Sequence, residues 1–204
     1  MNLRVPGPTP LPQAVREAAA ADMINHRGPE FKELLGAVVA DLRYVFQTEN
    51  DISLLTGSGT GGLEAAIVNL LCPGDRVVAV SIGAFGDRFA DMARTFGAEV
   101  TLVTAPWGQA ADPLALEEAL ARVPEARLVL VTHNETSTGV TNDLRTLAQV
   151  VRSRANGGPL LVVDGISSVG SIPLLTDAWG CDVVVSGSQK GWMAPPGLAM
   201  LSVS

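Results

Sequence analysis

Short runs of apolar residues alternate along the chain with stretches whose apolar positions recur every three to four residues. The apolar runs are bounded by Gly, Pro or Asp, which is typical of strands. Several are almost continuously Val, Leu or Ile, as expected for strands that are covered on both faces. The pattern predicts strands at residues 51–57, 75–81, 98–105, 126–134, 159–165, 181–188 and 197–204.

The stretches between most of these strands have the periodicity of helices. One of them follows Asp112 and Pro113, a capping residue and a proline suited to the first helical position. Another is expected to start just after Asn142. Helices are expected at residues 31–47, 60–71, 86–96, 113–122 and 143–155. The alternation of strands and helices predicts an α/β fold, with a mostly parallel sheet sandwiched by helices.

The first fifty residues depart from this pattern. They open with the proline-rich stretch "MNLRVPGPTP" and continue into the helix expected at 31–47. We interpret residues 1–50 as an N-terminal arm and a connecting helix, and residues 51–204 as one layered domain.

Composition narrows the class of protein. The 204 residues are 47% apolar and 17% charged, so a sizeable core is expected and disorder is not. A net charge of −7 without a cluster of Lys or Arg argues against a nucleic-acid surface. The sequence has no apolar run of the roughly 20 residues that span a bilayer, and no signal-peptide core. Cys72 and Cys181 lie far apart without CxxC spacing, so we expect buried thiols in a reducing compartment, no metal site and a cytoplasmic location.

Polar and glycine-rich segments follow five of the expected strands. They are "GSGTGG", "IGAFGDR", "HNETSTG", "GISSVG" and "QKGW". Ligands of open α/β sheets bind beyond the carboxyl ends of the strands. The sequence therefore predicts a ligand site at this edge of the sheet.

The first of these segments suits a phosphate group. Glycines allow close approach of the backbone, the start of a helix offers free N–H groups, and Ser58 and Thr60 add hydroxyls. The spacing is neither that of a dinucleotide fingerprint nor that of a P-loop, so a single phosphate fits best. Taken alone, an ordinary tight turn between strand and helix explains these glycines equally well.

Two charged residues lie at or just after the ends of later apolar runs. Asp164 follows four apolar residues, and such a carboxylate is costly to bury unless it pairs, for example with a cationic ring nitrogen. Lys190 follows a later strand, and Lys32 is the only other lysine in the chain. A helix cap and a solvated loop lysine are the alternatives for these two residues. A phosphate, an acid and a lysine together predict a pyridoxal phosphate (PLP) site with a lysine Schiff base.

The motifs resemble those of a known family. "PGPTPLP", "HRGPEF", "GSGTGGLEAAIVNLL", "GAFGDRF", "HNETSTGV", "VDGISSVG" and "SGSQKGWMAPPGLAM" occur in that family's order and cover nearly the whole chain. The chain resembles the class V aminotransferases of fold type I, in the branch of alanine/serine–glyoxylate aminotransferases. The resemblance implies PLP, a homodimer, and transamination between alanine or serine and a small oxo acid such as glyoxylate or pyruvate. It also implies that residues 51–204 are the PLP-binding large domain. The family's smaller C-terminal domain, which supplies an arginine for the substrate carboxylate, is expected to be absent from this chain.

The resemblance gives roles to particular residues. Lys190 would be the Schiff-base lysine and therefore the catalytic residue, and Asp164 the partner of the ring nitrogen. Phe85 would stack on the ring, where relatives commonly have tryptophan. Ser137, with Thr136 and Thr138 as neighbours, would lie near the ring oxygen. The phosphate contacts would come from Ser58, Gly59, Thr60 and Gln189.

Six further positions have less definite expectations. His133 is expected to be structural, and the role of Glu135 is open. Gly7 should let the N-terminal arm pass close to the site. If the chain acts alone, Arg4, Arg27 or Arg88 would have to bind the substrate carboxylate.

Two alternative functions remain at this point. The first is a non-catalytic or weakly PLP-binding fragment. The second is another PLP enzyme of the class, such as a lyase or desulfurase. A desulfurase needs a cysteine on a mobile loop, whereas Cys72 and Cys181 lie in or beside a predicted helix and strand.

Overall fold

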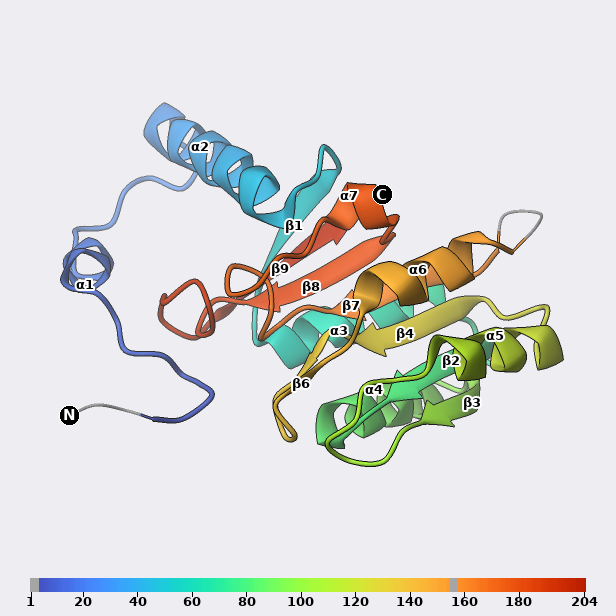
Figure 1. The fold of residues 1–204 in the computed structure, drawn as a ribbon. Helices are drawn as coiled ribbons and strands as arrows, with labels where there is room; N and C mark the ends of the chain where they lie inside the picture. The colour runs from blue at the N-terminus through green and yellow to red at the C-terminus, as the bar shows by residue number, and fades with distance from the viewer. Residues whose placement is uncertain (1–3, 155–157) are drawn as a thin grey trace.

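A computed structural model describes residues 4–154 and 158–204. Its centre is a sheet of seven strands with helices on both faces (Figure 1). The strands lie in the spatial order β1 (Asp51–Thr56), β9 (Leu198–Val203), β8 (Val183–Gly187), β7 (Leu160–Asp164), β4 (Leu128–Thr132), β2 (Arg76–Ser81) and β3 (Glu99–Thr104). All seven predicted strands are therefore confirmed.

The sheet is mostly parallel, as predicted. The neighbours from β8 through β7, β4 and β2 to β3 pair in parallel. Only β9 runs against its neighbours, because it pairs antiparallel with both β1 and β8. The carboxyl ends of the other six strands consequently meet at one edge of the sheet.

The five predicted helices are also present. They are α2 (Pro29–Phe46), α3 (Gly59–Leu70), α4 (Ala84–Thr95), α5 (Pro113–Arg122) and α6 (Leu144–Arg152). Four short elements were not predicted: α1 (Gln13–Ala19), α7 (Thr176–Trp179), β5 (Asn134–Glu135) and β6 (Val140–Thr141). The expected end of α6, residue 155, lies outside the described residues.

The start of α6 differs by one residue from the prediction. Asp143 is its N-cap, and the side chain accepts a hydrogen bond from Thr146 N. Asn142 is buried instead, where its amide donates to Thr132 O at 2.9 Å and accepts from Ala111 N at 2.9 Å. Both residue types can cap helices, so the sequence alone did not separate them.

Apolar side chains fill the space on both faces of the sheet. On one face, α3 and α4 pack through Leu63, Ile67 and Phe89 against the alternate residues of the central strands. On the other face, α5 and α6 pack with the last turns of α2. This layered core holds the ends of the parallel strands at fixed positions.

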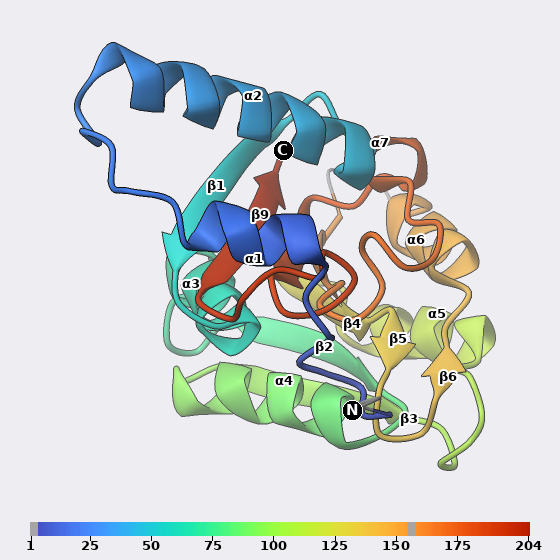
Figure 2. The ribbon, with the colours of Figure 1, turned by 90° about the vertical axis from the view of Figure 1, so that its left-hand side faces the viewer.

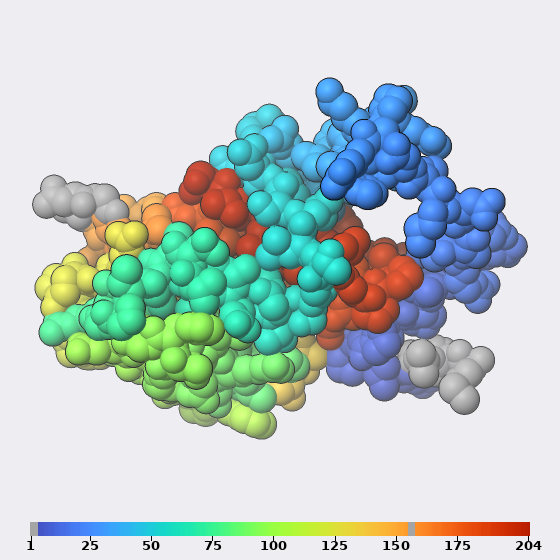
Figure 3. All heavy atoms as spheres, turned by 180° about the vertical axis from the view of Figure 1, so that it is seen from behind, coloured from blue at the N-terminus to red at the C-terminus, as the bar shows by residue number. Residues whose placement is uncertain are grey.

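The N-terminal segments contribute little to this core. Helix α1 has no buried residue, and α2 buries only Leu42 and Phe46 near its end. Both helices project from the body of the molecule in the space-filling view (Figure 3). In Figure 2 the arm and α1 lie in front of the sheet. Among the described residues, no helix is both long and apolar enough to cross a membrane.

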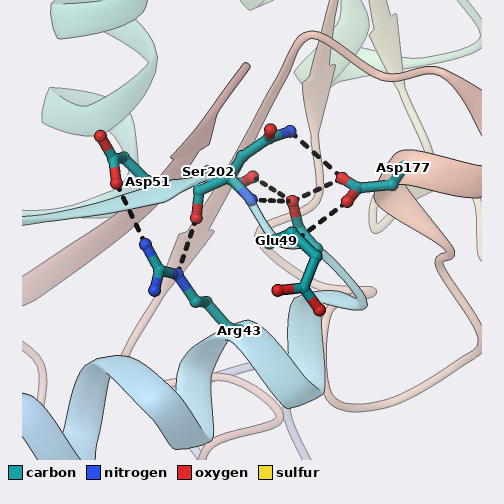
Figure 4. A network of polar contacts seen from close by, with 7 residues as sticks. Arg43, Glu49, Asp51, Asp177 and Ser202 are labelled. Carbon is teal, nitrogen blue, oxygen red and sulfur yellow. Dashed lines mark hydrogen bonds and ion pairs between the residues drawn. The ribbon is translucent and has the colours of Figure 1, made fainter.

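A polar network fixes the junction between α2 and β1 (Figure 4). Arg43 donates to Asn50 O at 2.9 Å and to the Asp51 carboxylate at 3.0 Å. Asp177 in α7 accepts hydrogen bonds from the Thr48 hydroxyl, from Glu49 N and from the Asn50 side chain. The network therefore holds the end of α2 against the sheet while its beginning stays outside.

Candidate active site

A cavity of about 160 Å³ opens at the carboxyl edge of the sheet. It collects residues from the starts of α3 and α4 and from the segments after β4, β7 and β8. The cavity is lined by Ser58, Gly59, Thr60, Leu63, Phe85, Arg88, Phe89, Met92, Asn134, Thr136, Asp164, Ile166, Ser167, Gln189 and Lys190. Seven of the eight residues predicted for the site are among them.

The start of α3 presents backbone donors to the cavity. Ser58 is the N-cap, and its hydroxyl accepts from Gly61 N at 3.2 Å. The Gly59 and Thr60 N–H groups belong to the first turn, where no preceding helical carbonyl accepts from them. A Cβ atom on Gly59 would lie 2.6 Å from Cδ1 of Ile166, so a side chain there would require Ile166 to shift. These donors and the positive end of the helix dipole suit an anion.

Asp164 lies buried at the end of β7, with 5% of its surface exposed. Its carboxylate accepts a hydrogen bond from Ile166 N at 3.0 Å. Burial raises the pKa of Asp164 to about 6, the charge of Glu135 adds to the rise, and the Ile166 N–H and the charge of Lys190 oppose it. A cation in the cavity would favour the ionised form of this carboxyl group.

Lys190 follows β8 and reaches the N-terminal arm. Its Nζ donates to Pro6 O at 3.3 Å. Thr9 fastens the arm to the lysine loop, because its N–H donates to Gln189 O at 3.0 Å and its hydroxyl to Lys190 O at 3.0 Å. A Cβ atom on Gly7 would lie 2.9 Å from Lys190 Nζ. The expectation that Gly7 allows the arm to pass close to the lysine is thus confirmed.

The side chain of Gln189 also faces the cavity. Its Oε1 is buried and has no hydrogen-bond partner in the described part of the chain. Buried polar atoms are normally paired, so this oxygen is available to accept a hydrogen bond from a ligand. Its NH₂ can donate to a phosphate oxygen beside the start of α3.

The predicted role of Ser137 does not coincide with its position. Its side chain does not line the cavity; the hydroxyl donates to Glu135 at 2.7 Å and accepts from Ala84 N at 3.0 Å. Two residues of the same segment, Asn134 and Thr136, line the cavity instead. Asn134 is held by a hydrogen bond from its Nδ2 to the Ser167 hydroxyl at 2.9 Å. The polar run "HNETSTG" after a strand indicated that this segment contributes to the site. It did not indicate which of its residues point into the cavity.

His133 faces away from the cavity, as a structural residue would. Its ring packs edge-on against Trp179 with ring centroids 6.0 Å apart. Burial lowers the pKa of His133 to about 4, so the imidazole is neutral at ordinary pH.

Arg88, one of the three arginines named as possible carboxylate ligands, also lines the cavity. It lies on α4 one turn after Phe85 and is exposed at the cavity. Its guanidinium forms no ion pair among residues 4–154 and 158–204. A free guanidinium beside a cavity suits a carboxylate or phosphate.

Comparison with known proteins identifies the family of the chain. Residues 6–204 match the family described as "Aminotransferase class-V". The "Soluble hydrogenase, small subunit" of Synechococcus sp. is 44% identical over 99% of this chain and 53% of that protein. The L-aspartate–glyoxylate aminotransferase of Paracoccus denitrificans is 42% identical over 98% of this chain and 51% of that protein. The crystal structure of an alanine–glyoxylate aminotransferase from Nostoc sp. superposes with a TM-score of 0.92 at 36% identity, over 98% of this chain and 52% of that one.

The fold and the cavity define the large domain of a fold-type I aminotransferase. The chain belongs to the class-V aminotransferase family, as its motifs indicated. It spans about half the length of the relatives that it matches.

Proposed function

We propose that the protein takes part in PLP-dependent transamination between a small amino acid, alanine or serine, and a small 2-oxo acid such as glyoxylate or pyruvate. The observation that carries this proposal is that Lys190, Asp164 and the start of α3 line one cavity. An amine, an acid and an anion-binding helix end are the three groups that a pyridoxal phosphate requires. The family of the chain supports the same cofactor.

The residues of the cavity fit PLP. The N–H groups of Gly59 and Thr60, with the side-chain NH₂ group of Gln189, would bind its phosphate. Asp164 would bind the protonated ring nitrogen, and this pairing would offset the cost of burying the carboxylate. Phe85 would offer its aromatic face to the ring.

PLP, when bound, supplies an electron sink for the electron pair that remains when the substrate α-carbon loses a proton. The remaining work belongs to the chain. Lys190 would hold the cofactor's aldehyde and, once displaced by the substrate amine, its Nζ would move the proton of the substrate α-carbon. Asp164 would keep the ring nitrogen protonated by its charge. The hydrogen bond from Lys190 Nζ to Pro6 O would hold the lysine amine beside the arm.

The names of the relatives differ, but the aminotransferases among them share one oxo acid. Two relatives are called hydrogenase subunits, and others are called aspartate–, serine– or alanine–glyoxylate aminotransferases. The aminotransferase names share glyoxylate and vary in the amino donor. We therefore propose glyoxylate as the preferred oxo acid and leave the donor as a small amino acid.

The N-terminal helices support the expectation of a homodimer. Leu34, Leu35 and Val38 on α2 are 52%, 39% and 37% exposed. A second copy of the chain, or the remainder of a longer one, would cover this apolar face.

The desulfurase alternative is not favoured by the cavity. A desulfurase needs a reactive thiolate at the site, but neither cysteine lines the cavity. Cys181 is buried, and burial raises the pKa of its thiol to about 12. Such a thiol stays protonated and is a poor nucleophile.

The proposed cofactor attachment can be tested by borohydride reduction. The protein is incubated with PLP, reduced and mapped by mass spectrometry, with Lys190→Ala and Lys32→Ala as a matched pair. We expect the cofactor on Lys190 in the wild type and in Lys32→Ala, and none in Lys190→Ala. A label on Lys32, or equal labelling of all three proteins, would overturn the assignment. An alanine–glyoxylate assay on PLP-loaded protein that has not been reduced then separates an enzyme from a non-catalytic PLP-binding protein.

A further inference from the structure

We propose that Glu135 is a positioning residue of this site, which holds Phe85 at the cavity by capping α4 from the neighbouring hairpin. The inference rests on the proposed function, because Phe85 matters only if a cofactor ring lies against it. It adds to that function a residue whose side chain does not itself line the cavity.

Helix α4 has no side-chain cap of its own. Its N-cap is Gly83, and no side chain at that position bonds to the first turn. A Cβ atom on Gly83 would lie 2.7 Å from Cγ of Glu135 and 2.6 Å from Oγ of Ser137. The glycine therefore makes room for a cap that comes from another segment of the chain.

That cap is the carboxylate of Glu135. Its Oε2 accepts from Phe85 N at 3.1 Å and from Gly86 N at 3.0 Å. The preceding N–H, of Ala84, donates to the Ser137 hydroxyl at 3.0 Å, and that hydroxyl donates to Oε1 of Glu135 at 2.7 Å. Three N–H groups of the first turn are thus bound by one carboxylate and its serine partner.

The carboxylate is held rigidly in turn. Glu135 is fully buried, and its Oε1 also accepts from Ser137 N at 3.0 Å. Its main-chain oxygen accepts from Gly139 N at 2.8 Å, which closes the turn between β5 and β6. A buried negative charge at the positive end of a helix is a favourable pairing. The pairing explains why a glutamate is tolerated in a fully buried place.

The capped turn carries the aromatic ring of the site. Phe85 is the second residue of α4, its N–H is one of the donors that Glu135 binds, and its ring lines the cavity. Aromatic stacking depends on ring offset, and a displacement of about 1 Å can change a rate by a hundredfold. The position of the ring therefore depends on the bonds that Glu135 makes to the backbone beneath it.

A double-mutant cycle on PLP binding tests this role. Glu135→Gln keeps the shape but replaces one acceptor oxygen by an NH₂ group, which cannot accept from the N–H groups of α4. We expect PLP affinity to fall roughly 10- to 100-fold, the range for losing a hydrogen bond to a charged group. In the Phe85→Ala background the same substitution should change affinity by less than about threefold, because the ring to be positioned is gone. Glu117→Gln, an exposed glutamate on α5, is the control and should match the wild type in both backgrounds.

A second readout is the visible circular dichroism of the bound cofactor, at saturating PLP. Glu135→Gln should weaken this band, since a displaced ring lowers the asymmetry around the cofactor. Equal loss of affinity with and without the Phe85 ring, or no loss in the protein that keeps Phe85, would overturn the inference. If Glu135→Gln does not fold, Ser137→Ala removes one link of the same cap and should give a smaller change in the same direction. Failure of the wild type to bind PLP at Lys190 would instead count against the proposed function.

Discussion

At the scale of single residues, Asp164 is poorly placed for an empty cavity and well placed for one that holds a cation. Its carboxyl group is buried, and burial disfavours the ionised form. Lys190 and the Ile166 N–H offset this cost only in part. Protein sites often carry such a cost because the ligand removes it. The same residue should therefore affect cofactor-free stability and cofactor binding in opposite directions.

We predict that Asp164→Asn stabilises the cofactor-free protein above pH 6 and weakens its function. Burial raises the pKa of Asp164 from 3.8 to about 6, so the folded wild type loses stability as the pH rises through this window. Asparagine keeps the acceptor for Ile166 N but does not ionise. The variant should gain up to about 3 kcal/mol over the wild type above pH 6, and the difference should vanish below about pH 4. Denaturant unfolding across pH 4–8 measures it, and a variant less stable than the wild type at pH 7 would contradict the argument.

The functional half of this prediction uses a form of the protein that turns over substrate. An amide cannot keep a ring nitrogen protonated by charge, so turnover should fall by several factors of ten, each of which corresponds to about 1.4 kcal/mol. Near-normal turnover in Asp164→Asn would remove this residue from the site. His133 has a lowered pKa in the same pH range, but it is common to both proteins and cancels in the comparison.

The residues that could be predicted from the sequence share one property, which is a position directly after a long apolar strand. Asp164 and Lys190 are examples, since the parallel sheet brings such ends together. Ser137 could not be separated from Thr136, because a strand of two residues and a turn decide which side chain points inward. Arg88 could not be chosen over Arg4 and Arg27 without knowing which face of α4 meets the cavity.

At the scale of elements, the long strands and helices were predictable and the short ones were not. Helix α7 has four residues, and strands β5 and β6 have two each, too few to show a period. Tertiary contacts form these elements, as the hydrogen bonds of Asp177 to the α2–β1 junction illustrate. The arm before α1 is a similar case, because its path is set by bonds to the lysine loop rather than by its own pattern.

We predict that Gly7→Ala reduces the reaction of Lys190 with PLP while leaving the fold intact. The added Cβ would lie 2.9 Å from Lys190 Nζ, and the flexible end of the lysine can turn aside at little cost to folding. When the lysine turns aside, its amine leaves Pro6 O and its position at the cavity. Borohydride-trapped labelling after a short PLP pulse should fall several-fold. Gly36→Ala, on α2 with nothing within 4 Å of its Cβ, is the matched control and should label like the wild type. Wild-type labelling in Gly7→Ala would mean that the arm does not constrain the lysine.

At the scale of the whole molecule, the described residues form the sheet edge at which we propose that PLP binds, and Arg88 and Lys190 are the cationic residues that line its cavity. The ring and aldehyde contacts that we propose lie between residues 58 and 190. The relatives are about twice as long as this chain. The exposed apolar face of α2 also shows that its beginning has no packing partner among the described residues.

We predict that this 204-residue chain, tested by itself, binds PLP more weakly than a relative of full length and transaminates little or not at all. Some binding should survive, because the helix start, Asp164 and Lys190 are all present. Orientation of the substrate depends strongly on a bidentate arginine, and the described cavity has only the guanidinium of Arg88. PLP titration paired with an alanine–glyoxylate assay measures both halves of the prediction. Robust turnover that is lost in Arg88→Gln would mean that α4 supplies the carboxylate ligand, whereas turnover that survives this change would direct attention to Arg4 or Arg27. In either case, a second domain would not be needed for chemistry, and the arm or α4 would supply the carboxylate ligand.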